Sequence, residues 1–96
     1  MSYDVIISPK ARLDLKNIAL YIANDNVVRA RSFTKELKQY FEDRLQNMPL
    51  SGRVIKGDIR MIPYKRYNTL YMVNEAQKRV FVLHIFAGAM DWESYI

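Results

Sequence analysis

Two amphipathic segments separated by only a few residues constrain the fold of this chain more than any other feature. The first begins after Ser8 and Pro9, which suit the cap and the first position of a helix. Its apolar side chains recur every three or four positions, as on one face of a helix: Ala11, Leu15, Ile18 and Ile22. The helix is expected to end near residues 24–26, because Asn and Asp favour turns and caps.

The second segment repeats this spacing and stops before Pro49, which cannot continue a helix. Its apolar positions are Ala30, Phe33, Leu37, Phe41, Leu45 and Met48. Its polar positions carry mixed charge and are expected to face solvent: Arg29, Arg31, Lys35, Lys38, Glu42 and Asp43. Because the connection is so short, the two helices are expected to lie antiparallel as a hairpin.

The rest of the chain has the character of β-strands. Residues 3–8 form a short β-branched run, and residues 59–65, 67–74 and 79–88 are rich in β-branched and aromatic side chains. Residues 49–58 are expected to form a loop with a short strand at 53–56, and Pro63 restricts its strand to a sheet edge or a bulge. The sequence therefore predicts one α+β domain over residues 1–96, ordered β-α-α-β-β-β, with the helical hairpin packed on a curved, mainly antiparallel sheet.

The net charge of +5 is concentrated in one part of the chain. Residues 53–79 hold seven bases and two acids, whereas the remainder holds eight of each. Such a segment favours a polyanion or an acidic partner, and the alternative is a charged face that maintains solubility.

Other classes of function are disfavoured by what the sequence lacks. It has no cysteine and one histidine, so neither a disulfide framework nor a zinc site is expected, and we expect no cofactor. No apolar run is long enough for a bilayer, and the first residues lack the pattern of a signal peptide. These observations predict a cytoplasmic protein.

An ordered set of short motifs resembles the RelE/ParE family of bacterial toxins. The set comprises SPKA, DLKNIALYI, F-x3-L, P-x-x-G at residues 49–52, R-x6-Y-x3-Y-x-V from Arg60 to Val73, and G-x-x-D-W from Gly88 to Trp92. The resemblance implies a cytosolic toxin that is held inactive by a cognate antitoxin protein. RelE-like members cut mRNA on the ribosome, and ParE-like members inhibit DNA gyrase.

The positions that carry RelE-like catalysis differ in this chain. Cleavage of RNA by its own 2′-OH requires a base, an acid and a cation beside the phosphorane. Where RelE-like enzymes are similar in placing basic residues or a histidine, this sequence has Asn68, Met90 and Ala87. These substitutions argue against RNA cleavage.

Several residues remain candidates for binding. Arg60, Lys65 and Arg66 could contact phosphate, with a solvated edge as the alternative. Tyr67 and Tyr71 could stack on bases, but cross-strand packing is the favoured interpretation. His84, predicted to share a face with Val80, Val82 and Phe86, is interpreted as a core or sheet residue rather than a base.

The last residues are interpreted as structural and partner-binding. Asp91 is expected to cap a short helix, and Trp92 to cover the open end of the core. The first hypothesis is a ParE-like toxin that inhibits DNA gyrase, is neutralised by an antitoxin, and binds its partners through Arg53, Arg60, Lys65, Arg66, Asp91, Trp92 and Tyr95. The alternatives are a ribosome-dependent mRNA endonuclease using Arg60, Lys65, Arg66 and Tyr95, or a toxin-derived binding module without toxicity.

Overall fold

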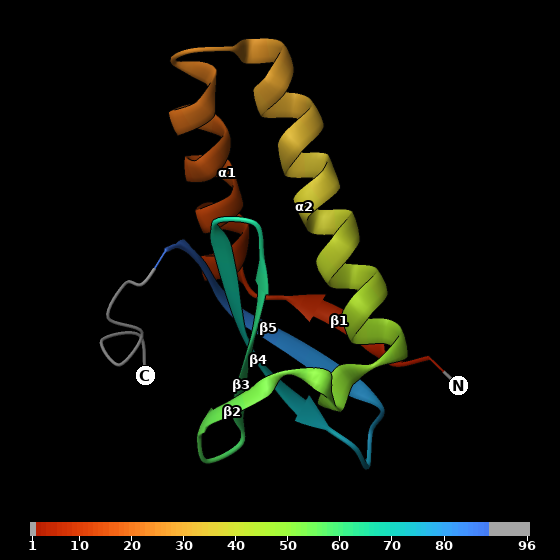
Figure 1. Cartoon of the computed structure of the whole chain (residues 1–96). Helices are drawn as coiled ribbons and strands as arrows, with labels where there is room; N and C mark the ends of the chain where they lie inside the picture. The colour runs from red at the N-terminus through yellow and green to blue at the C-terminus, as the bar shows by residue number, and fades with distance from the viewer. Residues whose placement is uncertain (1, 89–96) are drawn as a thin grey trace.

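The computed structural model describes residues 2–88, in which two helices precede most of a five-stranded sheet (Figure 1). The elements are β1 (Asp4–Ile7), α1 (Pro9–Ala23), α2 (Val27–Asn47), the 3-10 turn η1 (Pro49–Ser51), β2 (Arg53–Lys56), β3 (Ile59–Tyr64), β4 (Tyr67–Asn74) and β5 (Arg79–Ala87). This order confirms the α+β prediction, and the short strand expected at 53–56 forms as β2.

Both helices begin at the caps that the sequence provides. The Ser8 side chain accepts a hydrogen bond from the Ala11 amide at 3.0 Å, and Pro9 occupies the first helical position, where no donor is lost. Asn26 caps α2 in the same way, accepting from the Arg29 amide at 2.9 Å. The three-residue connection makes α1 and α2 an antiparallel hairpin (Figure 1).

The sheet has the strand order β1-β5-β4-β3-β2, with β1 parallel to β5 and every other pair antiparallel. Pro63 pairs with Asn68 of β4, whereas β2 pairs with β3 only at residues 59–61. The proline therefore lies where β3 has no neighbour on its other side, so its missing N–H breaks no ladder. The prediction that the strand lies at a sheet edge is therefore wrong for β3 as a whole, which lies between β4 and β2, although Pro63 itself lies at a locally unpaired part of it.

The core lies between the helical hairpin and one face of the sheet. From α2 the fully buried side chains are Ala30, Phe33, Leu37, Phe41 and Leu45, as the sequence predicts. Met48 was also predicted to belong to this stripe, and that prediction is wrong. Its backbone leaves the helical conformation at φ −136°, because Pro49 follows, and its side chain is 54% exposed.

A β-bulge in β5 reverses which side chains face the helices. Tyr71 pairs with Val82 but Leu70 pairs with His84, so Leu83 is an extra residue in the strand. His84 consequently lies on the face opposite to Val82. The prediction that it shares a face with Val80 and Val82 is wrong, because strict alternation does not hold across the bulge.

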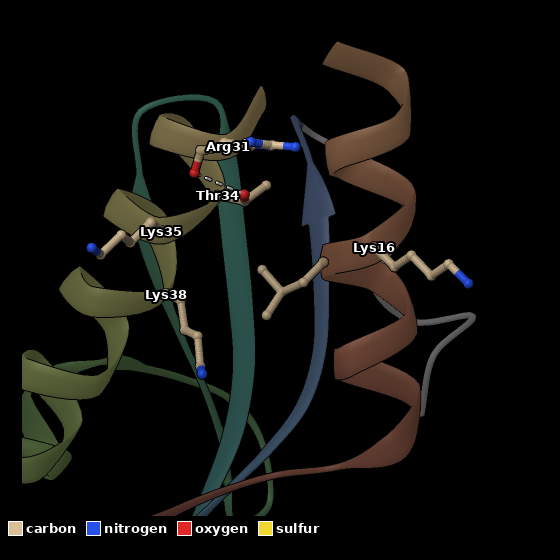
Figure 2. A pocket seen from close by; sticks show the side chains of 6 residues that line it. Lys16, Arg31, Thr34, Lys35 and Lys38 are labelled. Atoms are coloured by element: carbon tan, nitrogen blue, oxygen red, sulfur yellow. Dashed lines mark hydrogen bonds between the residues drawn. The ribbon is translucent and has the colours of Figure 1, made fainter. Parts of the chain in front are cut away.

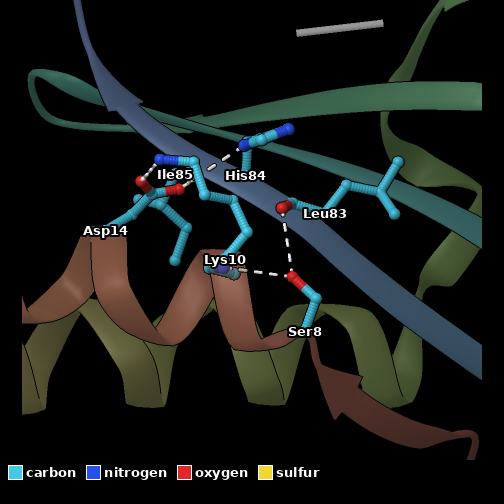
Figure 3. Close-up of polar contacts among 7 residues, drawn as sticks. Ser8, Lys10, Asp14, Leu83, His84 and Ile85 are labelled. Atoms are coloured by element: carbon cyan, nitrogen blue, oxygen red, sulfur yellow. Dashed lines mark hydrogen bonds and ion pairs between the residues drawn. The ribbon is translucent and has the colours of Figure 1, made fainter.

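Beyond the end of β1, the edge of β5 is covered by helix α1 and the residue before it (Figure 3). The Ser8 hydroxyl donates to the Leu83 carbonyl at 3.1 Å, and the Ile85 amide donates to Asp14 Oδ2 at 3.0 Å. Asp14 is also paired with Lys10 at 3.1 Å, and His84 Nδ1 lies 3.7 Å from the same carboxylate. These side chains satisfy backbone groups that a longer β1 would otherwise pair with.

Candidate functional site

Arg60, a predicted phosphate ligand, is used inside the fold. Its Nη1 donates to the carbonyls of Leu50 and Gly52, at 3.1 and 2.9 Å. The guanidinium therefore holds the η1 loop against β3. A guanidinium that donates to two carbonyls in this way has fewer N–H groups left to donate to a substrate phosphate.

Tyr71 fixes the same η1 loop through two hydrogen bonds. Its hydroxyl donates to the Pro49 carbonyl at 2.8 Å and accepts from the Gly52 amide at 2.9 Å, and its side chain is fully buried. Burial raises the pKa of the phenol, since the charged form is penalised away from water. A Cβ on Gly52 would meet this hydroxyl, which explains the glycine of the P-x-x-G motif. Tyr71 is therefore a packing residue, as favoured from the sequence, and does not offer its ring to a nucleobase.

Lys65 closes the β3–β4 turn onto α2. Its Nζ lies 2.9 Å from Glu36 Oε2 and sits over the rings of Phe33 and Tyr64, at 5.6 and 5.4 Å from their centroids. The hydrogen bond between the two charges lowers the pKa of Glu36 and raises the pKa of Lys65. Both side chains are exposed, so solvent screens the ion pair. The pair therefore contributes little to the free energy of unfolding.

The remaining predicted cations lie at different ends of the sheet. Arg53 is exposed on β2, the outermost strand. Arg66 is exposed in the β3–β4 turn, next to Tyr67, whose ring packs on Phe33 at 5.5 Å. The basic segment 53–79 is therefore not one continuous patch.

Of the three positions that carry RelE-like catalysis, the structure describes Asn68 and Ala87 but not Met90. Asn68 Nδ2 donates to the Gly88 carbonyl at 2.8 Å, so this amide fixes the end of β5. Ala87 is exposed at the last position of β5. The predictions for Met90, Asp91, Trp92 and Tyr95, including the terminal helix, fall outside the described residues. Within residues 2–88, no three metal-ligating side chains come together, and no helix is both long and apolar enough to span a membrane.

A groove between α1 and α2 is edged by cations of both helices, of which Arg31, Lys35 and Lys38 were expected only to face solvent (Figure 2). The groove has a volume of about 440 Å³ and is lined by Leu15, Lys16, Arg31, Thr34, Lys35 and Lys38. A second recess, of about 290 Å³, continues it with Ile7, Arg12, Leu15 and Lys38. We call these two recesses the helical groove. Its floor is apolar and its rim holds five cations and no acid.

Most of the rim charge is not paired with an acid among residues 2–88. Lys38 lies 3.6 Å from Glu42, whereas Lys16, Arg31 and Lys35 form no ion pair among the described residues. A signal for this site was present in the sequence. Arg31, Lys35 and Lys38 follow at i, i+4 and i+7 on one helix face, where Glu42 is the acid that follows them, but their neighbour across the groove comes from another helix.

The comparisons with known proteins agree with this fold. Residues 5–92 match the family described as ParE toxin of type II toxin-antitoxin system, parDE. The chain belongs to the ParE toxin family. It is therefore the toxin of a type II toxin–antitoxin system. Comparison of this ParE-family chain with curated protein sequences gave no match.

Solved structures share the fold of this ParE-family chain at low sequence identity. The RelBE2 toxin–antitoxin complex of Mycobacterium tuberculosis matches with TM-score 0.73 and 18% identity, over 94% of this chain and 95% of that chain. The chromosomal ParDE system of P. aeruginosa matches with TM-score 0.76 and 16% identity, over 90% and 96%. The isolated E. coli RelE toxin matches with TM-score 0.62 and 16% identity, over 96% and 90%. At this identity the likeness establishes the fold alone.

Proposed function

We propose that this toxin inhibits DNA gyrase by binding to it, and that it does not cleave RNA. One observation carries the proposal: two of the three cations that a nuclease would use, Arg60 and Lys65, are engaged within the fold, whereas Arg66 forms no ion pair among residues 2–88. Arg60 is bonded to two backbone carbonyls, Lys65 is paired with Glu36, and the position of a RelE-like arginine is Asn68, whose amide fixes the end of β5.

The chemistry of RNA cleavage indicates how much rate is lost when such a cation is missing. A preorganised donor aimed at a developing negative charge contributes roughly a hundredfold or more to the rate. A neutral amide bonded to a carbonyl supplies no such charge. The ParE family match and the neutral Asn68 support the same proposal, under which the protein acts in the cytoplasm with its target.

Purified protein added to a DNA gyrase supercoiling assay tests this function. We expect inhibition that rises with toxin concentration, and no cleavage of mRNA on translating ribosomes. Asn68→Arg is expected to leave mRNA uncut, because no base accompanies the new cation. Cleavage of mRNA by the unaltered chain, with supercoiling unaffected, would show that the endonuclease alternative is right.

We further propose that the helical groove receives the antitoxin that neutralises this toxin, through an acidic amphipathic segment. The structures of RelBE2 and ParDE are described as toxin–antitoxin systems, which supports such a partner here. An apolar floor edged by three unneutralised cations fits a segment with apolar side chains on one face and carboxylates beside them. Lys16, Arg31 and Lys35 are therefore expected to accelerate association and to make it sensitive to salt.

A matched pair of triple variants tests the groove against the basic segment 53–79. Lys16→Gln, Arg31→Gln and Lys35→Gln together should slow association with the cognate antitoxin and flatten its salt dependence. The control triple, Arg53→Gln, Lys56→Gln and Arg79→Gln, removes the same charge from the sheet and should have less effect. If the control triple slows association more, the antitoxin docks on the sheet segment instead.

A further inference from the structure

Beyond Lys10, which begins this face and pairs with Asp14, five exposed positions on the outward face of α1 carry no charge, although 26% of the chain consists of charged residues. We call this surface the neutral stripe, and its members are all exposed: Leu13, Asn17, Leu20, Tyr21 and Asn24. Leu13 is 48% exposed, Leu20 58% and Tyr21 74%. The cations Arg12 and Lys16 of the same helix lie instead in the helical groove.

A recess opens beside the neutral stripe. It has a volume of about 290 Å³ and is lined by Asn17, Ile18, Tyr21, Arg66, Tyr67 and Ala87. Its walls are fixed from behind, because the Gly88 amide donates to the Arg66 carbonyl at 2.6 Å and the Tyr67 ring packs on Phe33. The Arg66 side chain forms no ion pair within residues 2–88.

The neutral stripe and its recess have the residue composition that is typical of the centre of a protein–protein interface. Such centres are depleted in charge and enriched in aromatic residues and arginine, and their strongest contacts are made by tyrosine and arginine beside a pocket. A tyrosine that is three-quarters exposed next to a fixed apolar recess matches this pattern. A nucleic acid fits poorly, because phosphates require several cations and this surface offers only Arg66.

We propose that the neutral stripe and its recess form the surface with which this toxin binds its protein target. An uncharged apolar side chain of the target enters the recess between Tyr21 and Tyr67, and a carboxylate beside it pairs with Arg66. This inference rests on the proposed function, because it requires that the chain act by binding a protein. The acidic antitoxin segment, in contrast, is attracted to the charged groove on the other side of α1.

The test uses full-length variants altered at exposed positions, so that folding is preserved. Tyr21→Ala, Leu20→Glu and Arg66→Ser are compared with Leu50→Ala, which removes a side chain of similar exposure from η1. Growth arrest on expression, inhibition of supercoiling, antitoxin affinity and thermal melting are measured for each. Growth arrest depends on no assumption about the target, so it separates this inference from the gyrase proposal.

We expect Tyr21→Ala and Leu20→Glu each to weaken inhibition about tenfold or more, and Arg66→Ser to weaken it less. Melting temperature and antitoxin affinity should stay near those of the unaltered protein, as should all properties of Leu50→Ala. If supercoiling is unaffected by the unaltered chain but growth arrest is lost in the stripe variants, the gyrase proposal fails and this inference stands.

Three results would overturn the inference. The first is full growth arrest by the folded stripe variants, or none by the unaltered chain. The second is loss of antitoxin binding in the stripe variants, which would assign the recess to the antitoxin. The third is a dimer of the unaltered chain that dissociates in the stripe variants, which would show that a second copy occupies the stripe.

Discussion

The positive charges of the sheet region and those of the helical groove differ in what surrounds them. Arg60 and Lys65 are surrounded by acceptors from the protein itself, namely two carbonyls and a carboxylate. Lys16, Arg31 and Lys35 line the rim of a groove with no acid in its lining, and the ends of Lys16 and Lys35 point outward from it (Figure 2). The comparison teaches that local charge in the sequence does not locate a binding site. What matters is whether the fold has already used the charge.

The largest expected effect comes from disturbing the loop that the engaged charges hold. In Gly52→Ala, the added Cβ would lie within 2.9 Å of Ile62 Cγ2 and still closer to the Tyr71 hydroxyl. The loop must move and both buried hydrogen bonds of that hydroxyl weaken, so we expect a loss of about 3 kcal/mol in the free energy of unfolding. Urea denaturation measures it.

A double variant controls for the cause of that loss. Tyr71→Phe removes the hydroxyl, so Gly52→Ala should cost less in the Tyr71→Phe background than alone. Equal costs in the two backgrounds would mean that the hydroxyl is not what confines Gly52.

The next effect concerns the engaged cation itself. Arg60→Met keeps the length and apolar stem of the side chain but removes both hydrogen bonds to the carbonyls of η1. We expect a loss of about 2 kcal/mol, because hydrogen bonds from charged donors are stronger than neutral ones. Arg53→Met, on the exposed face of β2, should change stability little. If both variants are equally stable, Arg60 is as free as Arg53 and the contrast between the two regions fails.

A smaller, pH-dependent effect is expected for the exposed pair of Lys65 and Glu36. The pKa of Glu36 is held below its ordinary value of 4.5 by the hydrogen bond from Lys65, and the pKa of Lys65 is held above its ordinary 10.5. The stabilisation is therefore fully present between those two ordinary values. It is lost as the pH falls through the lowered pKa of Glu36, or rises through the raised pKa of Lys65.

Thermal melting across pH measures this pair. Lys65→Met should lower the melting temperature at pH 7 by at most about half the shift seen with Arg60→Met, because solvent screens the pair. The difference from the unaltered protein should shrink below pH 4.5. A difference that stays constant through acid pH would assign the role of Lys65 to its ring contacts rather than to Glu36.

The smallest effect on stability is expected in the helical groove. Replacing Lys16, Arg31 and Lys35 together by Gln removes three cations that have no partner among the described residues. Stability should change by less than about 0.5 kcal/mol, and a slight gain from relieved repulsion is consistent with the comparison. A large loss would show that the groove cations are structural after all.

The elements of the fold could be predicted because their signals are local. Ser8, Pro9 and Asn26 determine helix ends through contacts within three residues, and the apolar spacing of α2 identifies its buried face. The face of His84 could not be predicted, because the bulge at Leu83 depends on how β5 pairs with β4. Pairing over long distances leaves no trace in the alternation of a single strand.

The candidate site was harder to predict than the fold for the same reason. Arg60 looked like a ligand because its acceptors, the carbonyls of Leu50 and Gly52, have no sequence signature. The groove was missed because its two walls come from different helices. The neutral stripe was visible only as exposed positions of α1, once the other face of that helix had been assigned to the core.

The pairing of β1 with β5 has a consequence for the order in which the protein can assemble. Asp4 is the register partner of Arg79, and Asp14 bonds to Ile85, so the first elements of the chain are completed by the last strand. While a ribosome is still producing residues before Arg79, the helical hairpin lacks β5, the strand against which α1 packs. Such non-local contacts delay folding until β5 has been made. Both surfaces of α1 therefore acquire their final shape only after β5 has been made, which delays the moment at which a toxin can act on the cell that makes it.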